Sequence, residues 1–423
     1  NWNVDIGKTT FRTNVSFTPS YLIIGSNGDN YRDANITDNR NGVHIINRKT
    51  GQRFRNFADG SIGDLDVNGT LVYKNRIYFG NDNDEFICAD LNGNIKYSLP
   101  VSGDVESEPV LIKIKGKDAL VFGTEAGELR AINPFNGKTI WQHFHSKFNG
   151  WKMGDNRLVF KVKTHFSMTY LFLTKPLVKD LNSDGVGDLV YLINGDFYSV
   201  NGKNGKILHH FDVTEDYDRW DDPGVLHNAC YSSESMIFIK NNAGQYNVTI
   251  PKFSYRPVRD SYRSDGYEFH IVTYDLGGKI IEKRLIAEKV NSNDFVRLSN
   301  TNIYVSGDKI FQFDNQMQLT SKTNLEKIQK VQEGYFQYFI SGQLLEVDEH
   351  KCLVFLFQYE NLIVFYDIDS GKAIRTYKLQ GRSEFIPVIE DVNKDGRMDL
   401  LYADDSNYLT CLDLGEGIKI LNK

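Results

Sequence analysis

The sequence contains few cysteines, few prolines and no long apolar run. Its four cysteines are far apart and form no C-x-x-C pair, which argues against a zinc ribbon, a redox motif or a dense disulfide scaffold. No apolar stretch approaches the roughly 20 residues that a transmembrane helix needs. The net charge is −6 without a basic block, which disfavours binding to a nucleic-acid backbone. We therefore expect no transmembrane segment and no nucleic-acid partner.

The familiar catalytic fingerprints are also missing. The sequence has no G-x-S-x-G, H-E-x-x-H, P-loop or dinucleotide-binding pattern. Nothing therefore requires an enzyme, and we assign no catalytic residue and no organic cofactor. The chain starts at Asn1 without a Met, so we expect that a signal peptide has been removed and that the protein is secreted or periplasmic.

Strand-forming residues and turn residues dominate what is present. Aromatic residues make up 13% of the chain, and 35 glycines stand against 9 prolines. Short apolar runs are broken by Gly, Asn and Asp, and several runs alternate between apolar and polar residues. This pattern predicts an all-β protein.

One pattern of short strands repeats along the whole chain. A strand that ends near Gly is followed by a strand that ends in Asp or Asn, a G-K or G-N turn and a final strand, as at 120–144 and 189–211. Eight such units average about 53 residues, near the roughly 40–50 typical of a four-stranded propeller blade. The predicted units begin near Phe11, Gly60, Gly103, Ser146, Leu226, Glu288, Lys330 and Gln380.

We therefore predict a single β-propeller domain over 1–423, with eight four-stranded blades and an insertion at 245–270 within the fifth. Seven blades are the alternative count, and two β-sandwich domains would need a linker that the sequence does not show. The terminal blade is expected from residues 383–422. The strand Trp2–Ile6 has no partner in its own unit, so it is expected to pair with the terminal blade.

Two nine-residue stretches, 180–188 and 391–399, both read D-x-N-x-D-G-x-x-D between strand-like segments. Oxygen-bearing side chains at positions 1, 3, 5 and 9, with Gly at position 6, suit a hard cation. No helical pattern follows, so a helix–loop–helix calcium site is not expected, and metal-free Asp/Asn/Gly turns are the alternative. We predict one structural calcium ion in each loop. The predicted ligands are Asp180, Asn182, Asp184, the carbonyl of Val186 and Asp188, and Asp391, Asn393, Asp395, the carbonyl of Arg397 and Asp399.

These motifs resemble two known families of propellers. The run G-x-L-x-A-I-N-x-x-N-G-K-x-I-W at 127–141 resembles the repeat of PQQ-like, quinoprotein-type eight-bladed propellers, and the two acidic loops resemble the FG-GAP-type calcium loops of integrin-α propellers. The resemblance implies a calcium-stapled propeller, a fold that hosts dehydrogenases, assembly factors, lyases and adhesins. Quinone-dependent dehydrogenases carry a vicinal cysteine pair and many docking tryptophans. This chain has no adjacent cysteines and only four tryptophans, which argues against that activity.

Two segments are candidate ligand surfaces. The segment 245–270 interleaves Tyr and Arg, residue types enriched at protein interfaces, although it could also be a solvent-exposed hairpin. The acidic segment 212–224 surrounds a Trp, which suits a sugar site, although an acidic inter-blade connector is the favoured interpretation. We predict a monomeric, non-enzymatic scaffold for a protein or glycan, and the alternative is a polysaccharide lyase or hydrolase. The candidate ligand residues are Trp220, Tyr255, Arg259 and Tyr262.

Overall fold

The fold comes from a computed structural model. The side chains of residues 193, 196, 212, 252–257, 264–267, 289–290, 295–297, 306 and 338–339 are not described, although their backbone is. The structure describes residues 1–10, 13–28, 40–57, 66–105, 107–145, 176–193, 196–213, 236–257, 264–290, 295–297, 302–306, 308–327, 338–383 and 385–421.

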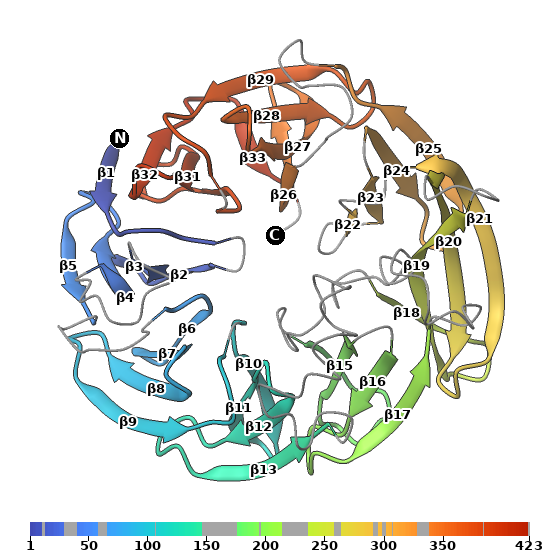
Figure 1. The fold of residues 1–423 in the computed structure, drawn as a ribbon, viewed down its shortest axis with the longest axis horizontal. Helices are drawn as coiled ribbons and strands as arrows, with labels where there is room; N and C mark the ends of the chain where they lie inside the picture. Colours follow the sequence, from blue (N-terminus) through green and yellow to red (C-terminus); the bar gives the residue numbers. More distant parts are fainter. Residues whose placement is uncertain are drawn as a thin grey trace. The chain divides into compact units, whose positions relative to one another are not determined.

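All the regular elements in these residues are β-strands, 33 in number, and they form eight antiparallel sheets. The chain is therefore all-β and folds as an eight-bladed β-propeller (Figure 1). The predicted fold class is confirmed, with eight blades and not seven. The blades are numbered here in chain order and fall into two compact units, Asn1–Pro109 with Val296–Lys423, and Val110–Phe295.

The first unit holds blades 1, 2, 6, 7 and 8, and two of them contain a strand from elsewhere in the sequence. The strands are, in blade 1, β2 (Val15–Phe17), β3 (Tyr21–Asn27), β4 (Asn41–Asn47) and β5 (Arg53–Asn56); in blade 2, β6 (Thr70–Tyr73), β7 (Arg76–Asn81), β8 (Glu85–Asp90) and β9 (Ile95–Pro100); in blade 6, β22 (Phe295–Arg297), β23 (Ile303–Ser306), β24 (Lys309–Phe313) and β25 (Leu319–Asn324); in blade 7, β26 (Tyr338–Val347), β27 (His350–Phe357), β28 (Leu362–Asp367), β29 (Ala373–Lys378) and β33 (Ile418–Ile420); and in blade 8, β30 (Val388–Glu390), β31 (Asp399–Ala403), β32 (Tyr408–Asp413) and β1 (Trp2–Asp5).

The second unit holds blades 3, 4 and 5, each made of four consecutive strands. The strands are, in blade 3, β10 (Val110–Ile114), β11 (Lys117–Gly123), β12 (Glu128–Ile132) and β13 (Thr139–Phe144); in blade 4, β14 (Leu177–Lys179), β15 (Asp188–Ile193), β16 (Asp196–Val200) and β17 (Ile207–Asp212); and in blade 5, β18 (Ile237–Lys240), β19 (Tyr246–Pro257), β20 (Ser264–Asp275) and β21 (Ile280–Val290).

The hydrophobic core lies between neighbouring blades. The second and third strands of a blade are covered on both faces, so β27 and β28 read as continuous apolar runs, whereas the fourth strand β13 buries one face only. One cluster joins blades 3 and 4 through Val121 and Leu189, and another joins blades 7 and 8 through Val354 and Leu400. Large aromatic side chains fill these interfaces, which explains the aromatic-rich composition. The fully buried examples include Tyr78, Tyr191, Tyr274, Tyr304, Phe122 and Phe355.

The predicted closing strand is confirmed, but the end of the terminal blade differs from the prediction. Strand β1 pairs with β32, with Trp2 opposite Cys411 and Asp5 opposite Tyr408. Ile418–Ile420, expected in the terminal blade, instead forms β33 and pairs with β26 of blade 7. The reason is that β1 already occupies the free edge of β32, so the chain after Leu414 has no edge to join there.

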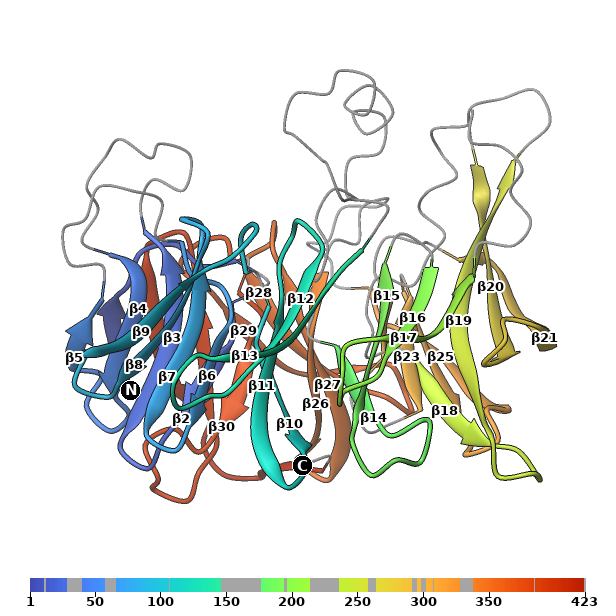
Figure 2. The same ribbon diagram turned by 90° about the horizontal axis from the view of Figure 1, so that it is seen from below.

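The segment 245–270 contributes long strands of blade 5 itself. Strands β19 and β20 are each 12 residues long and pair along nearly their whole length. In Figure 2 the hairpin that they form extends well beyond β18, the first strand of the same blade. The predicted insertion is thus an elongated β19–β20 hairpin.

Candidate metal-binding loops

Each acidic loop connects the first two strands of its blade. Residues 180–187 lie between β14 and β15, and residues 391–398 lie between β30 and β31, with the ninth loop residue starting the second strand. In blade 3 the same connection is a two-residue turn, Lys115–Gly116, between the paired residues Ile114 and Lys117. The acidic loops therefore replace a simple hairpin turn at equivalent positions of two blades.

The two loops have the same backbone conformation. The fourth residue, Ser183 or Lys394, has φ of 61° or 63°, and the sixth, Gly185 or Gly396, has φ of 80° or 90°. A Cβ added at either glycine would contact nothing within 4 Å. Glycine is therefore favoured here by the left-handed backbone conformation and not by close packing. Two left-handed residues in so short a span curl the chain around the side chains at positions 1, 3 and 5.

Those side chains accept hydrogen bonds from the amides of their own loop. In the first loop Asp180 accepts from the N–H groups of Asp184 (3.2 Å) and Gly185 (3.0 Å). Asn182 Oδ1 accepts from Asp184 N–H (2.9 Å), and Asp184 Oδ1 accepts from Val186 N–H (2.9 Å). The second loop repeats all four bonds at 3.0, 3.1, 2.8 and 2.9 Å. Two distant segments thus fold into one and the same oxygen-lined turn.

The ninth residue of each loop is a buried carboxylate. Asp188 is 0% exposed and accepts from Leu181 N–H (2.9 Å) and Gly202 N–H (3.2 Å). Asp399 is 1% exposed, and its Oδ2 accepts from Val392 N–H (2.9 Å), but its Oδ1 has no hydrogen-bond partner among the described residues. Burial raises the pKa of both carboxyl groups. A buried carboxylate oxygen without a donor is costly unless a cation or another donor meets it.

The donor set has the chemistry that calcium prefers. Calcium takes six to eight oxygen ligands, and each loop offers carboxylate or amide oxygens at positions 1, 3, 5 and 9 and a carbonyl at position 7. In the described part of the chain no three His, Cys, Asp or Glu side chains are gathered closely enough to hold a metal ion as they stand. Each carboxylate has about four acceptor positions, so it can keep its amide bond and also ligate a cation. Oδ1 of Asp399, which has no donor among the described residues, would gain a partner from such a cation.

The first loop contacts the joint between blades 3 and 4. Asn201, directly after β16, donates from Nδ2 to Asp184 Oδ2 (3.2 Å), and the next residue, Gly202, binds Asp188. The carbonyl of Gly202 accepts the indole N–H of Trp141 from blade 3 (2.8 Å). The Trp141 ring lies over Gly205, where a Cβ would come within 2.6 Å of it. The loop, the turn after β16 and the tryptophan of the preceding blade thus form one connected unit.

The second loop contacts the joint between blades 8 and 1. Arg48 of blade 1, only 7% exposed, donates to the carbonyls of Asp391 (2.7 Å) and Val392 (2.8 Å) and also to Thr18 (2.9 Å). Its own carbonyl accepts the indole N–H of Trp2 (2.9 Å). Both described tryptophans, Trp2 and Trp141, therefore dock onto a turn of a neighbouring blade beside an acidic loop.

The second loop also carries an internal cation. The guanidinium of Arg397, at position 7, contacts Asp395 Oδ2 (3.1 Å) and Asp413 Oδ2 (2.9 Å). The hydrogen bond from the Arg397 side chain to Asp395 holds the pKa of the Asp395 carboxyl below its usual value. Sequence reasoning assigned only the carbonyl of Arg397 and did not single out Asp413 or Arg48, because neither is near the loop in sequence.

The candidate ligand surface lies mostly outside the described residues. Trp220, Arg259 and Tyr262 are among the residues that the structure does not describe, and so is most of the acidic segment 212–224. Tyr255 lies in β19, where its backbone pairs with Tyr267 of β20, but its side chain is not described. No helix in the described part of the chain is long and apolar enough to cross a membrane.

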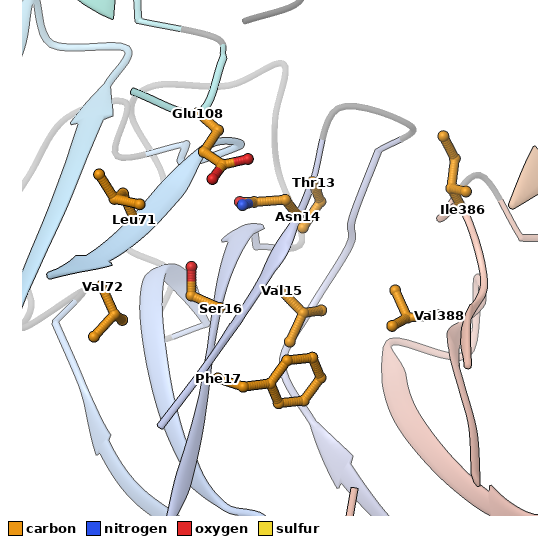
Figure 3. A pocket seen from close by; sticks show the side chains of 10 residues that line it. All are labelled: Thr13, Asn14, Val15, Ser16, Phe17, Leu71, Val72, Glu108, Ile386 and Val388. Carbon is orange, nitrogen blue, oxygen red and sulfur yellow. The ribbon is translucent and has the colours of Figure 1, made fainter. Parts of the chain in front are cut away.

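A separate hollow of about 500 Å³ lies in the first unit, where β2, β6 and β30 approach one another (Figure 3). Its polar wall is already engaged, since the side chain of Asn14 binds both the N–H (2.7 Å) and the carbonyl (2.8 Å) of Thr70. Ser16 donates to the same carbonyl (2.9 Å). The hollow shows no feature that selects a ligand. Its lining residues are Thr13, Asn14, Val15, Ser16, Phe17, Leu71, Val72, Glu108, Ile386 and Val388.

Comparison with known proteins identifies the fold and no family. No family model matches the chain, and no curated protein matches it. Among solved structures it is similar to the computationally designed protein Ika8, with a TM-score of 0.51 and 14% identity over 97% of this chain and 99% of that one. It is also similar to BamB from Moraxella catarrhalis, with a TM-score of 0.51 and 10% identity over 98% and 99% of the two chains. At such identities the likeness concerns the fold alone.

Proposed function

We propose that this protein is a calcium-stabilised β-propeller that acts outside the cytoplasm as a non-enzymatic binding scaffold for a protein or glycan. The fold is one that often serves for binding, and the likeness to BamB supports a place in the wider PQQ-like superfamily. Each of the two acidic loops would hold one calcium ion through the ligands predicted from the sequence.

The observation that carries the calcium proposal is the buried carboxylate at the ninth position. Asp399 is 1% exposed, and its Oδ1 has no hydrogen-bond partner among the described residues. An anionic oxygen in that state is expensive to bury, and a divalent cation shared with the oxygens of Asp391, Asn393 and Asp395 would remove the cost. The matching hydrogen bonds of the first loop support the same proposal for residues 180–188.

The position of the loops favours a structural role for the metal. Both replace a hairpin turn, and both contact residues that join neighbouring blades, Trp141 through Gly202 in one case and Arg48 in the other. A cation that fixes such a loop would therefore stiffen a blade joint. Weak module-type calcium sites fill at the millimolar concentrations found outside cells, which supports a secreted or periplasmic location.

The ligand surface is proposed in the segment 245–270, which contains β19 and the first part of β20. Tyr255, Arg259 and Tyr262 belong to this segment, and Tyr and Arg offer large contact areas and forked donors that no blade core needs. The hairpin is long for a blade strand pair, and it extends beyond β18 (Figure 2). A projecting hairpin of this kind would leave the blades intact while it contacts a partner.

Thermal unfolding with and without calcium tests the metal proposal. Because calcium would bind the native state only, its concentration at about 100 times Kd should stabilise the fold by about 2.7 kcal/mol per site. The melting temperature should rise with added calcium, fall with a chelator and respond much less to magnesium. An Asp184→Ala, Asp395→Ala double variant is the control and should show no response. An unchanged melting temperature of the wild-type protein across millimolar calcium would refute the proposal.

A further inference from the structure

The two acidic loops share a fold but differ in the charges around the fifth position. We propose that Arg397 is a tethered cation that occupies the metal-binding carboxylate of the second loop and weakens its calcium affinity relative to the first loop. This inference rests on the proposed function, because it assumes that both loops bind calcium. It makes the second loop the weaker of the two and thus the one that responds to a change in calcium concentration.

The contacts of Arg397 place a positive charge on a predicted ligand. Its guanidinium lies 3.1 Å from Oδ2 of Asp395, the carboxylate at position 5, and 2.9 Å from Oδ2 of Asp413. Asp395 Oδ1 accepts from the N–H of Arg397 (2.9 Å), and Oδ2 also accepts from Nδ2 of Asn393 (3.1 Å), so the guanidinium adds a positive charge to a carboxylate that would also ligate the cation. Calcium and the guanidinium would therefore meet at one carboxylate, where their positive charges repel each other.

The first loop has neutral groups at the corresponding places. Its position 7 is Val186, which is 6% exposed and packs in the core between blades 3 and 4. The counterpart of Asp413, the last residue of β32, is Asn201, the residue directly after β16, and its amide donates to Asp184 Oδ2 (3.2 Å). The charge of Lys203 helps to lower the pKa of Asp184, but Lys203 forms no ion pair with it among the described contacts. The position-5 oxygen of this loop thus has no cation against it.

Simple electrostatics gives the direction and size of the effect. A guanidinium and a divalent ion that share one carboxylate would lie roughly 5 Å apart, and Arg397 is 48% exposed, so a water-like dielectric applies. Screened at physiological salt, this repulsion corresponds to a roughly five- to tenfold loss of calcium affinity. Asp413 offsets part of it by drawing the guanidinium aside, so Asp413 favours calcium binding in the presence of Arg397.

Calcium titration calorimetry on the full chain with one loop disabled tests the proposal. In the Asp184→Ala background, which leaves only the second loop, Arg397→Gln should tighten calcium binding roughly five- to tenfold. Arg397→Lys, which keeps the charge, should change the affinity much less, and Asp413→Asn should weaken it. At 1 M salt the gain from Arg397→Gln should shrink to about twofold or less, because the Debye length falls to about 3 Å.

The outcomes separate this inference from the proposed function. Calcium binding to both loops with no gain in Arg397→Gln, or an equal gain in Arg397→Lys, would overturn the role of the charge and leave the calcium sites in place. If one isolated loop, or both, did not bind calcium, the proposal of two calcium sites and the inference about Arg397 would both be overturned. If Arg397→Gln did not fold, the salt dependence of calcium binding by the unmodified second loop, compared with the first loop isolated by Asp395→Ala, would decide the question.

Discussion

His44 is buried in β4 beside the closing strand. From its burial we predict that the folded protein loses stability in acid. Its ring is 0% exposed, Nε2 donates to the carbonyl of Arg40 (2.6 Å), and Nδ1 has no hydrogen-bond partner in the described part of the chain. This arrangement holds the neutral ring, and burial lowers the pKa of His44 from 6.5 to about 4. The backbone of Arg40 and Ile6 and the carboxylate of Asp5 favour the charged ring, but the loss of hydration on burial outweighs them.

The sign of the pH effect follows from the order of the two pKa values. The folded pKa lies below the unfolded one, so the unfolded chain takes up its proton first as the pH falls. The contribution to stability is therefore complete above pH 6.5 and declines as the pH falls from 6.5 toward 4. Each pH unit in that window costs about 1.4 kcal/mol, so the loss at pH 5 is about 2 kcal/mol.

Urea unfolding at pH 7.5 and pH 5.0 measures this effect. At pH 7.5 the free energy of unfolding of His44→Leu should be about 1–3 kcal/mol lower than that of the wild type, because the hydrogen bond to Arg40 is lost. Between pH 7.5 and pH 5.0, however, the variant should lose about 2 kcal/mol less stability than the wild type. His350→Gln, at a half-exposed position, controls for the removal of an imidazole as such. An identical pH dependence in wild type and His44→Leu would refute the reasoning.

Two further predictions concern closure and ligand binding. Deletion of residues 1–7 should expose the edge of β32 and leave the carbonyl of Asn407 without the N–H groups of Ile6 (3.0 Å) and Gly7 (3.2 Å). The variant should therefore aggregate, which size-exclusion chromatography would detect. A variant that stays monomeric and equally stable would contradict this. For ligand binding, the Tyr255, Arg259, Tyr262 triple alanine variant should lose partner affinity at an unchanged melting temperature in a binding screen against proteins and glycans. The Asp216, Asp218, Asp221 triple alanine variant is its counterpart in the acidic segment, and a loss of polysaccharide turnover in that variant alone would replace the scaffold with an enzyme.

The blades and the acidic loops could be predicted because their information is local. A two-residue turn such as Lys115–Gly116 lies next to the strands that it joins, and the loop 391–399 contains all the positions that shape it. The partners of the loops could not be predicted in this way. Arg48 lies 343 residues from Asp391, and only the packing of blade 1 on blade 8 brings it to that carbonyl.

The terminal residues show the same limit of local reasoning. The pattern at 418–420 is an ordinary strand, and its sequence does not indicate which free edge it will join. In the folded chain β1 occupies the edge of β32, and 418–420 pairs with the edge of β26 instead. Arg375 then fixes the tail by donating to the carbonyls of Leu414 (2.9 Å) and Glu416 (3.2 Å). Such competition between edges is a property of the folded ring, and no short window of sequence contains it.

The pairing of β1 with β32 also has a consequence for the order of folding. Trp2 must find Cys411 across about 400 intervening residues, and closing so long a loop costs roughly 4 kcal/mol more entropy than closing a short hairpin. Blades built from consecutive strands can form before this contact, so blade 8 should be the slowest to complete. Until then the edge of β32 stays open in a partly folded chain, where β1 of a second molecule fits as well as its own. Refolding at high concentration should therefore yield strand-exchanged dimers, and dilution should suppress them.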